Sequence, residues 1–133
     1  MAEALAELGT EKALVIHSED GLDEISIAAP TRILQVIDGG VSGRTVRPSD
    51  FGVSEASLES VRGGTPDENA ATTRAVLAGE EGPPRDLAVM NAAAAIYVGT
   101  DSEDLLDCAN RARAAIDEGS ALKVLEQLQD FSG

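Results

Sequence analysis

Four carboxylates lie within six positions of the segment HSEDGLDEIS, residues 17–26. The apolar segments ALVI before them and ISI after them are typical of strands, which places the carboxylates in a turn. Asp20, Asp23 and Glu24 then follow the carboxyl end of a strand, where open α/β sheets bind ligands. The adjacent Asp23 and Glu24 repel each other unless positive charge lies beside them. Mg²⁺ would supply that charge, because it binds one or two carboxylates and completes its coordination with water and phosphate oxygens.

The same turn also fits a solvated connection, since Asp20-Gly21 is a common turn dipeptide. Its spacing matches neither an EF-hand calcium loop nor a zinc site nor a phosphate-binding P-loop. We expect His17, the only histidine, to be a hydrogen-bonded structural residue rather than a proton shuttle. The residues alone therefore leave two interpretations open, a metal pair at Asp23 and Glu24 or a solvated acidic turn. They assign no catalytic residue and do not identify substrate-binding residues.

Three further segments have simpler interpretations than a functional site. VRGG, residues 61–64, precedes a helix and offers backbone amides and Arg62 to an anion, although such glycine pairs mostly form turns. GPPRD, residues 82–86, and Asn91 fit a helix cap, an ion pair and a satisfied core amide. The single cysteine, Cys108, excludes an internal disulfide, suits a reducing compartment and is expected to fill apolar space.

Composition excludes several classes of partner. The chain carries 24 acidic and 10 basic residues, a net charge of −14, whereas nucleic-acid binding needs a concentrated basic face. One Tyr, two Phe and no Trp also argue against base stacking. The longest apolar stretch, residues 87–98, is shorter than the roughly twenty residues of a membrane span. With no basic and apolar leader at the start, we expect a cytoplasmic protein without a membrane partner.

The hydrophobic pattern changes from strands to helices along the chain. Residues 12–17 form an apolar segment typical of a strand buried on both faces of a parallel sheet. Segments 31–37 and 44–47, separated by Asp38-Gly39-Gly40, predict a hairpin. The other predicted elements are a strand at residues 24–27 and helices at residues 1–9, 65–77, 87–98, 105–116 and 120–131.

Two capping boxes are expected, Thr65 with Glu68 and Thr100 with Glu103, each at the start of a helix. The chain shows no repeat and no linker, so we expect one domain over residues 1–133. The predicted fold class is α/β, with a mixed, mostly parallel sheet that contains an antiparallel hairpin and is covered by helices.

Taken in order, the segments ALVIHSEDGLDEIS, PSDFG, RGGTPDENA, GPPRD and MNAAAAIYV resemble the anthranilate phosphoribosyltransferase family, over about residues 1–131. The resemblance implies part of a phosphoribosyltransferase or nucleoside phosphorylase-like catalytic domain. It implies transfer of a phosphoribosyl group from phosphoribosyl pyrophosphate to anthranilate in tryptophan biosynthesis. It also implies that Asp23 and Glu24, which match the family's Asp-Glu pair, bind Mg²⁺ in contact with pyrophosphate.

The family's glycine-rich pyrophosphate loop, its anthranilate-contacting residues and its helical amino-terminal domain all precede the matched region and have no counterpart here. The chain therefore resembles the carboxyl-terminal part of the catalytic domain, and alone it is expected to have little or no transferase activity. An exposed sheet edge would favour a homo-oligomer or domain swapping. Two alternatives stay open: a non-catalytic scaffold or partner-dependent subunit, and a related nucleoside phosphorylase, which fits the layers but not DGLDEIS.

Overall fold

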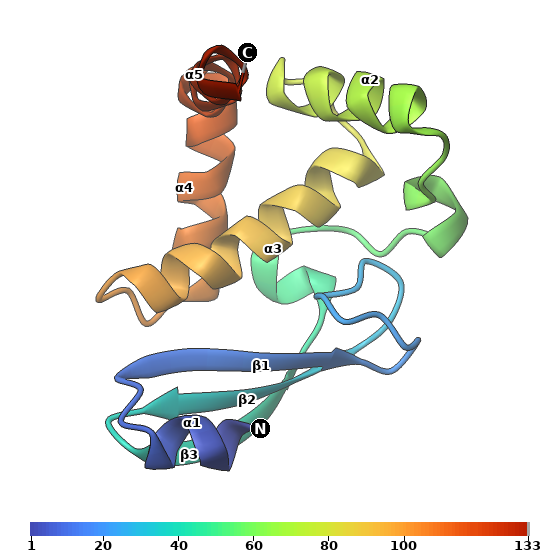
Figure 1. Ribbon diagram of the computed structural model, residues 1–133. Helices are drawn as coiled ribbons and strands as arrows, with labels where there is room; N and C mark the ends of the chain where they lie inside the picture. The colour runs from blue at the N-terminus through green and yellow to red at the C-terminus, as the bar shows by residue number, and fades with distance from the viewer. Residues whose placement is uncertain (133) are drawn as a thin grey trace.

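The computed structural model describes residues 1–132, with side chains through residue 131. Its strands are β1 (Lys12–Ser18), β2 (Thr31–Ile37) and β3 (Gly40–Val46). Its helices are α1 (Ala2–Glu7), α2 (Pro66–Leu77), α3 (Pro83–Gly99), α4 (Leu105–Asp117) and α5 (Ser120–Ser132), with short 3₁₀ helices η1 (Pro48–Phe51) and η2 (Leu58–Val61). The sheet and α1 form one end of the molecule and α2–α5 the other, with α3 lying next to the sheet (Figure 1).

The hairpin predicted around Asp38 is confirmed. β2 and β3 pair antiparallel, with Val36 opposite Val41. Asp38 and Gly39 connect them with φ values of 48° and 79°. Positive φ at both central residues is the geometry whose twist matches that of two antiparallel strands. The Asp-Gly dipeptide therefore determines this hairpin locally.

The α/β class is confirmed, but the described sheet is not mostly parallel. Its strand order is β1-β2-β3, and β1 pairs antiparallel with β2, so that Ile16 lies opposite Ile33. The connection over residues 19–30 contains no helix, and a parallel pair needs a crossover that is usually helical. Within residues 1–132, β1 is consequently an edge strand, and its apolar residues are only partly buried.

The strand expected at residues 24–27 does not form, although Ile25, Ser26 and Ile27 are fully buried. This segment packs against α3. The side chain of Asn91 in α3 forms hydrogen bonds with both the N–H and the carbonyl of Ile25. A short apolar run cannot by itself distinguish a strand from a buried loop of this kind.

One of the two predicted capping boxes is present. Thr65 Oγ1 accepts a hydrogen bond from the Glu68 N–H at 3.3 Å, and Glu68 Oε2 accepts one from the Thr65 N–H at 2.7 Å. The box expected at Thr100 is wrong, because α4 begins later, with Asp104 as N-cap accepting from the Leu106 N–H at 2.9 Å. Thr100 instead donates its hydroxyl to the Ile96 carbonyl at the end of α3.

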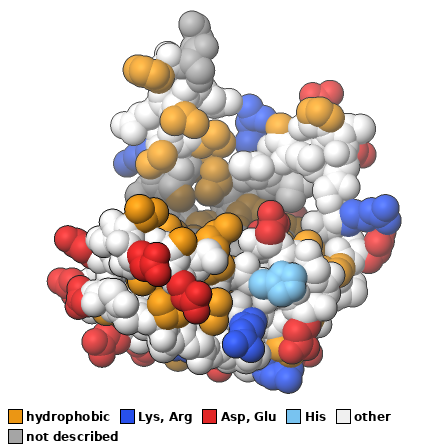
Figure 2. Space-filling model, turned by 60° about the horizontal axis from the view of Figure 1, so that its bottom comes forward, with side chains coloured by type: hydrophobic (Ala, Val, Ile, Leu, Met, Phe, Trp, Pro, Cys, Tyr) orange, Lys and Arg blue, Asp and Glu red, His pale blue; other side chains and the backbone are white. Residues whose placement is uncertain are grey.

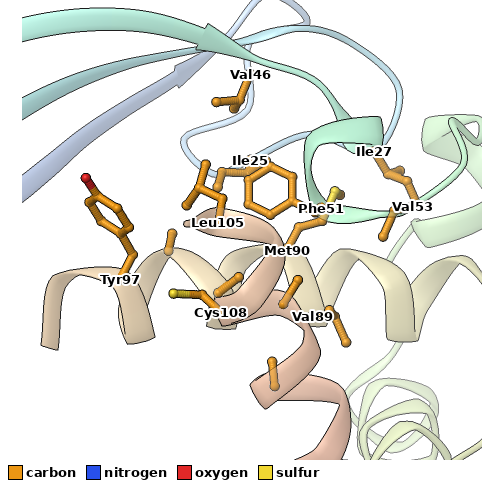
Figure 3. Close-up of a cluster of buried hydrophobic side chains, with 14 of the residues drawn as sticks. Ile25, Ile27, Val46, Phe51, Val53, Val89, Met90, Tyr97, Leu105 and Cys108 are labelled. Carbon is orange, nitrogen blue, oxygen red and sulfur yellow. The ribbon is translucent and has the colours of Figure 1, made fainter. Parts of the chain in front are cut away.

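A largely aliphatic core fills the space between the sheet and α3 and α4 (Figure 3). Phe51 and Met90 are fully buried within it, and Ile25 extends toward Phe51 from the connection over residues 19–30. Cys108 is also fully buried, as the expectation of an apolar filler requires. The small side chains of α3 and α4 allow close packing of the two helices; Ala93, Ala94, Ala109 and Ala112 are each at most 5% exposed. No helix among the described residues combines the length and apolarity needed to cross a membrane.

Candidate metal-binding site

Residues 19–30 form a loop, here called the acidic loop, that begins where β1 ends. Gly21 makes the turn with φ of 90°, a conformation that residues with a Cβ rarely adopt. The N–H of Ser18 donates to the Leu22 carbonyl at 3.1 Å, and the N–H of Glu19 donates to the Pro30 carbonyl at 3.0 Å. Backbone hydrogen bonds therefore close the base of the acidic loop on the sheet.

Asp20 holds the two sides of the acidic loop together. Its carboxylate accepts hydrogen bonds from the hydroxyls of Ser18 and Ser26, the latter at 2.5 Å. A backbone N–H, that of Leu22, donates to it at 3.4 Å. Both serines are fully buried, so their hydroxyls need this partner. Asp20, which the sequence placed after the strand end together with Asp23 and Glu24, is thus engaged in the structure of the loop.

The pKa of Asp20 lies below its ordinary value of 3.8. Desolvation is the largest single influence and raises the pKa. The hydrogen bonds from Ser18 and Ser26, with those from backbone N–H groups, outweigh it because they favour the ionised carboxylate. A depressed pKa in the folded state means that the ionised form stabilises the fold above pH 3.8, and that this stability is lost as pH falls through the folded-state pKa.

The variant Asp20→Asn should therefore lose less stability on acidification than the wild type. At pH 7 we expect it to be less stable by about 1 kcal/mol, since the carboxylate is solvent-exposed and only hydrogen bonds are weakened. Urea unfolding between pH 7 and pH 2.5 measures both effects. Glu19→Gln, which changes a neighbouring exposed carboxylate, is the control, and equal pH slopes for Asp20→Asn and the wild type would contradict the role given to Asp20.

Asp23 and Glu24 lie side by side in sequence on the surface, directly before the buried Ile25. Within residues 1–132 the structure gives neither side chain a hydrogen bond or an ion pair, in contrast to Asp20. The described residues also contain no group of three or more potential metal ligands. Two hard carboxylates without further protein ligands fit Mg²⁺, which takes its remaining ligands from water and phosphate. They do not fit zinc, which requires three or four protein ligands.

The structure separates the other predicted candidates from this pair. His17 is exposed near the end of β1, and the part of the chain that is described gives its side chain no hydrogen bond, so the expectation of a hydrogen-bonded histidine is not met. Figure 2 shows a histidine on the molecular surface, with acidic side chains spread over several parts of the same face. Arg62 pairs with Glu59 in an exposed contact of 3.4 Å, and the Gly64 N–H already donates to Asn69. Two of the groups considered for an anion site at residues 61–64 are thus already engaged in local contacts.

The interpretation of GPPRD and Asn91 as structural is confirmed, with partners that the sequence could not identify. Arg85 donates to Asp117 of α4 at 2.6 Å, and its side chain is only 12% exposed. Asn91 forms hydrogen bonds with both backbone groups of Ile25 in the acidic loop. A single amide in the mainly apolar segment of residues 87–98 was the only signal of this contact, because its partner lies 66 residues away.

Comparisons with known proteins agree with the resemblance seen in the sequence. Anthranilate phosphoribosyltransferase from Symbiobacterium thermophilum is 45% identical over 132 residues, which cover 99% of this chain and 39% of that protein. The crystal structure of anthranilate phosphoribosyltransferase from Thermus thermophilus has a TM-score of 0.84 at 35% identity, covering 95% of this chain and 37% of that chain. The anthranilate phosphoribosyltransferase from Saccharomyces cerevisiae in complex with PRPP and Mg has a TM-score of 0.78 at 25% identity, covering 85% of this chain and 33% of that one.

The chain thus spans about two fifths of the length of the curated relatives it matches. Residues 1–122 match the model of the family described as glycosyl transferase family, a/b domain. That match includes all three strands, the acidic loop and α2–α4. The chain therefore belongs to the glycosyl transferase family, through its a/b domain.

Proposed function

We propose that this chain supplies the magnesium-binding part of an anthranilate phosphoribosyltransferase, as the carboxyl-terminal part of its α/β domain. The reaction would transfer the phosphoribosyl group of phosphoribosyl pyrophosphate to anthranilate in tryptophan biosynthesis, in the cytoplasm. The observation that carries the proposal is the exposed pair Asp23 and Glu24, which the structure gives no ion pair within residues 1–132, on a loop held by the contacts of Asp20 and Ile25. The relatives named above, one of them in complex with PRPP and Mg, support the choice of substrate and metal.

Asp23 and Glu24 would hold Mg²⁺, which when bound offsets the charge of the pyrophosphate leaving group as it develops. The protein's part is to bind and orient. Its net charge of −14 opposes the approach of a polyanionic substrate, so carboxylates that hold a cation reverse the local charge where the pyrophosphate must lie. Asp20 holds the acidic loop in one conformation by accepting from Ser18 and Ser26, which fixes the direction in which the pair is presented.

A titration with Mg²⁺, with and without phosphoribosyl pyrophosphate, tests the proposal on the chain itself. We expect the amide NMR signals of residues 17–26 to shift saturably with Mg²⁺ and to shift further when phosphoribosyl pyrophosphate is added. The amide of Asp38, an exposed acid in the β2–β3 turn, is an internal control and should move little. Small shifts of equal size at all exposed acids would contradict a specific site.

The isolated chain is expected to be inactive and to self-associate. It spans 39% of its relative from Symbiobacterium thermophilum, so the remaining residues that bind the substrates must come from another part of the enzyme. Within residues 1–132, β1 has a strand partner on one side only, and free strand edges promote pairing between chains. Sedimentation should show a mass that rises with concentration, and transferase assays should show no turnover. A monomer at all concentrations, or substantial turnover, would contradict the respective expectation.

A further inference from the structure

Asn91 contacts the acidic loop from the middle of α3 and satisfies both backbone polar groups of one loop residue. Its Oδ1 accepts from the Ile25 N–H at 2.9 Å, and its Nδ2 donates to the Ile25 carbonyl at 3.1 Å. A further hydrogen bond, from Nδ2 to the Leu87 carbonyl at 3.1 Å, fixes the amide on its own helix. The side chain thus takes the place of the neighbouring strand that Ile25 lacks.

Ile25 is the residue directly after Asp23 and Glu24, and it is fully buried. Buried backbone N–H and C=O groups need partners, and loss of a partner costs the desolvation of the group left behind. Asn91 therefore allows the chain to enter the core one residue after two solvated carboxylates. The helix that carries Asn91, α3, packs along α4, and its residues Met90 and Ala93 are fully buried. Asn91 therefore attaches the loop to a well-packed helix.

We propose that Asn91 is a positioning residue for the metal-binding pair, acting through the backbone of Ile25. The inference rests on the proposed function, because the pair it positions is the magnesium pair. Asp20 joins Ser18, the last residue of β1, to Ser26 of the loop, whereas Asn91 ties the loop to α3. Backbone hydrogen bonds fix the base of the loop to the sheet, and Asn91 adds a contact to α3 directly after the two carboxylates.

The test measures Mn²⁺ binding with inorganic pyrophosphate, read as paramagnetic broadening of the amide signals of residues 17–26. Removal of residues that orient metal ligands costs roughly tenfold to a hundredfold in metal affinity. We expect Asn91→Ala to weaken Mn²⁺ binding by about tenfold. Asn91→Asp keeps an acceptor for the Ile25 N–H but turns a carboxylate oxygen toward the Ile25 and Leu87 carbonyls, and should also weaken Mn²⁺ binding.

Two controls separate positioning from stability. Asn110→Ala removes an exposed asparagine of α4 whose side chain, among the described residues, accepts a hydrogen bond from Arg113 alone, and should leave Mn²⁺ affinity unchanged. Val76→Ala destabilises α2 away from the acidic loop and should lower the unfolding temperature without changing affinity. If Asn91→Ala does not fold, Asn91→Asp carries the comparison.

Wild-type affinity in both Asn91 variants, with the wild type itself binding Mn²⁺, would overturn the positioning role and leave the proposed function intact. An equal loss in Val76→Ala would also overturn it, since the effect would then follow stability alone. Failure of the wild type to bind Mn²⁺ with pyrophosphate would instead refute the proposed metal site, and the positioning role with it.

Discussion

Replacement of Asp23 by Asn together with Glu24 by Gln is expected to abolish most phosphoribosyl transfer while leaving the fold near normal. The assay requires an active assembly, which can be built by exchanging this chain for the matching 132 residues of the Symbiobacterium thermophilum relative. Both substitutions keep side-chain size and remove charge, so the chimera would lose its hold on Mg²⁺. Loss of one electrostatic contact to developing charge costs about 10²–10³ in turnover, and we expect at least a hundredfold decrease.

The matched control also neutralises two carboxylates, but at a distance from the acidic loop. Glu11→Gln with Asp38→Asn neutralises two exposed acids at the opposite end of β1 from the acidic loop, and turnover should stay within about twofold, as exposed charges there have little influence. Unchanged turnover in the Asp23 and Glu24 double variant would refute the metal role. An inactive wild-type chimera would favour the alternative of a non-catalytic scaffold or partner-dependent subunit.

The parts of the fold that the sequence predicted are those in which neighbouring residues determine the outcome. Asp38-Gly39 specifies a tight hairpin because both positions need positive φ, and the Thr65 box satisfies the first N–H groups of α2 within four residues. In each case the physical cause lies within one turn of chain. The structure required no distant partner to form these features.

The parts that could not be predicted depend on distant partners. The apolar sequence of residues 12–17 does not reveal whether the strand pairs parallel or antiparallel with its neighbour. β1 is antiparallel to β2 because the loop after it returns directly to β2. Ile25 has the composition of a strand residue, but Asn91 competes for its backbone groups from 66 residues away. Position and residue type drew attention to Asp23 and Glu24 and the family resemblance assigned them a metal, whereas the contacts that hold the loop around them could be found only in three dimensions.

Ile25→Ala is expected to lower the free energy of unfolding by about 2–5 kcal/mol, the range for deletion of a buried isoleucine side chain. Ile25 is fully buried in the core cluster, beside Phe51 and Leu105 (Figure 3), although it belongs to a loop without regular secondary structure. Loops are usually tolerant of substitution because their side chains contact water. A large cost here would mean that the acidic loop unfolds together with the core.

Urea unfolding measures this cost, and Ile37→Ala is the control of the same residue type. Ile37 is 39% exposed at the end of β2, so its truncation should cost about 1 kcal/mol or less. Equal effects at the two positions would show that the loop opens independently of the domain. In that case neither Asp20 nor Asn91 could hold the carboxylates in place, because a mobile loop would lose the geometry on which a two-ligand metal site depends.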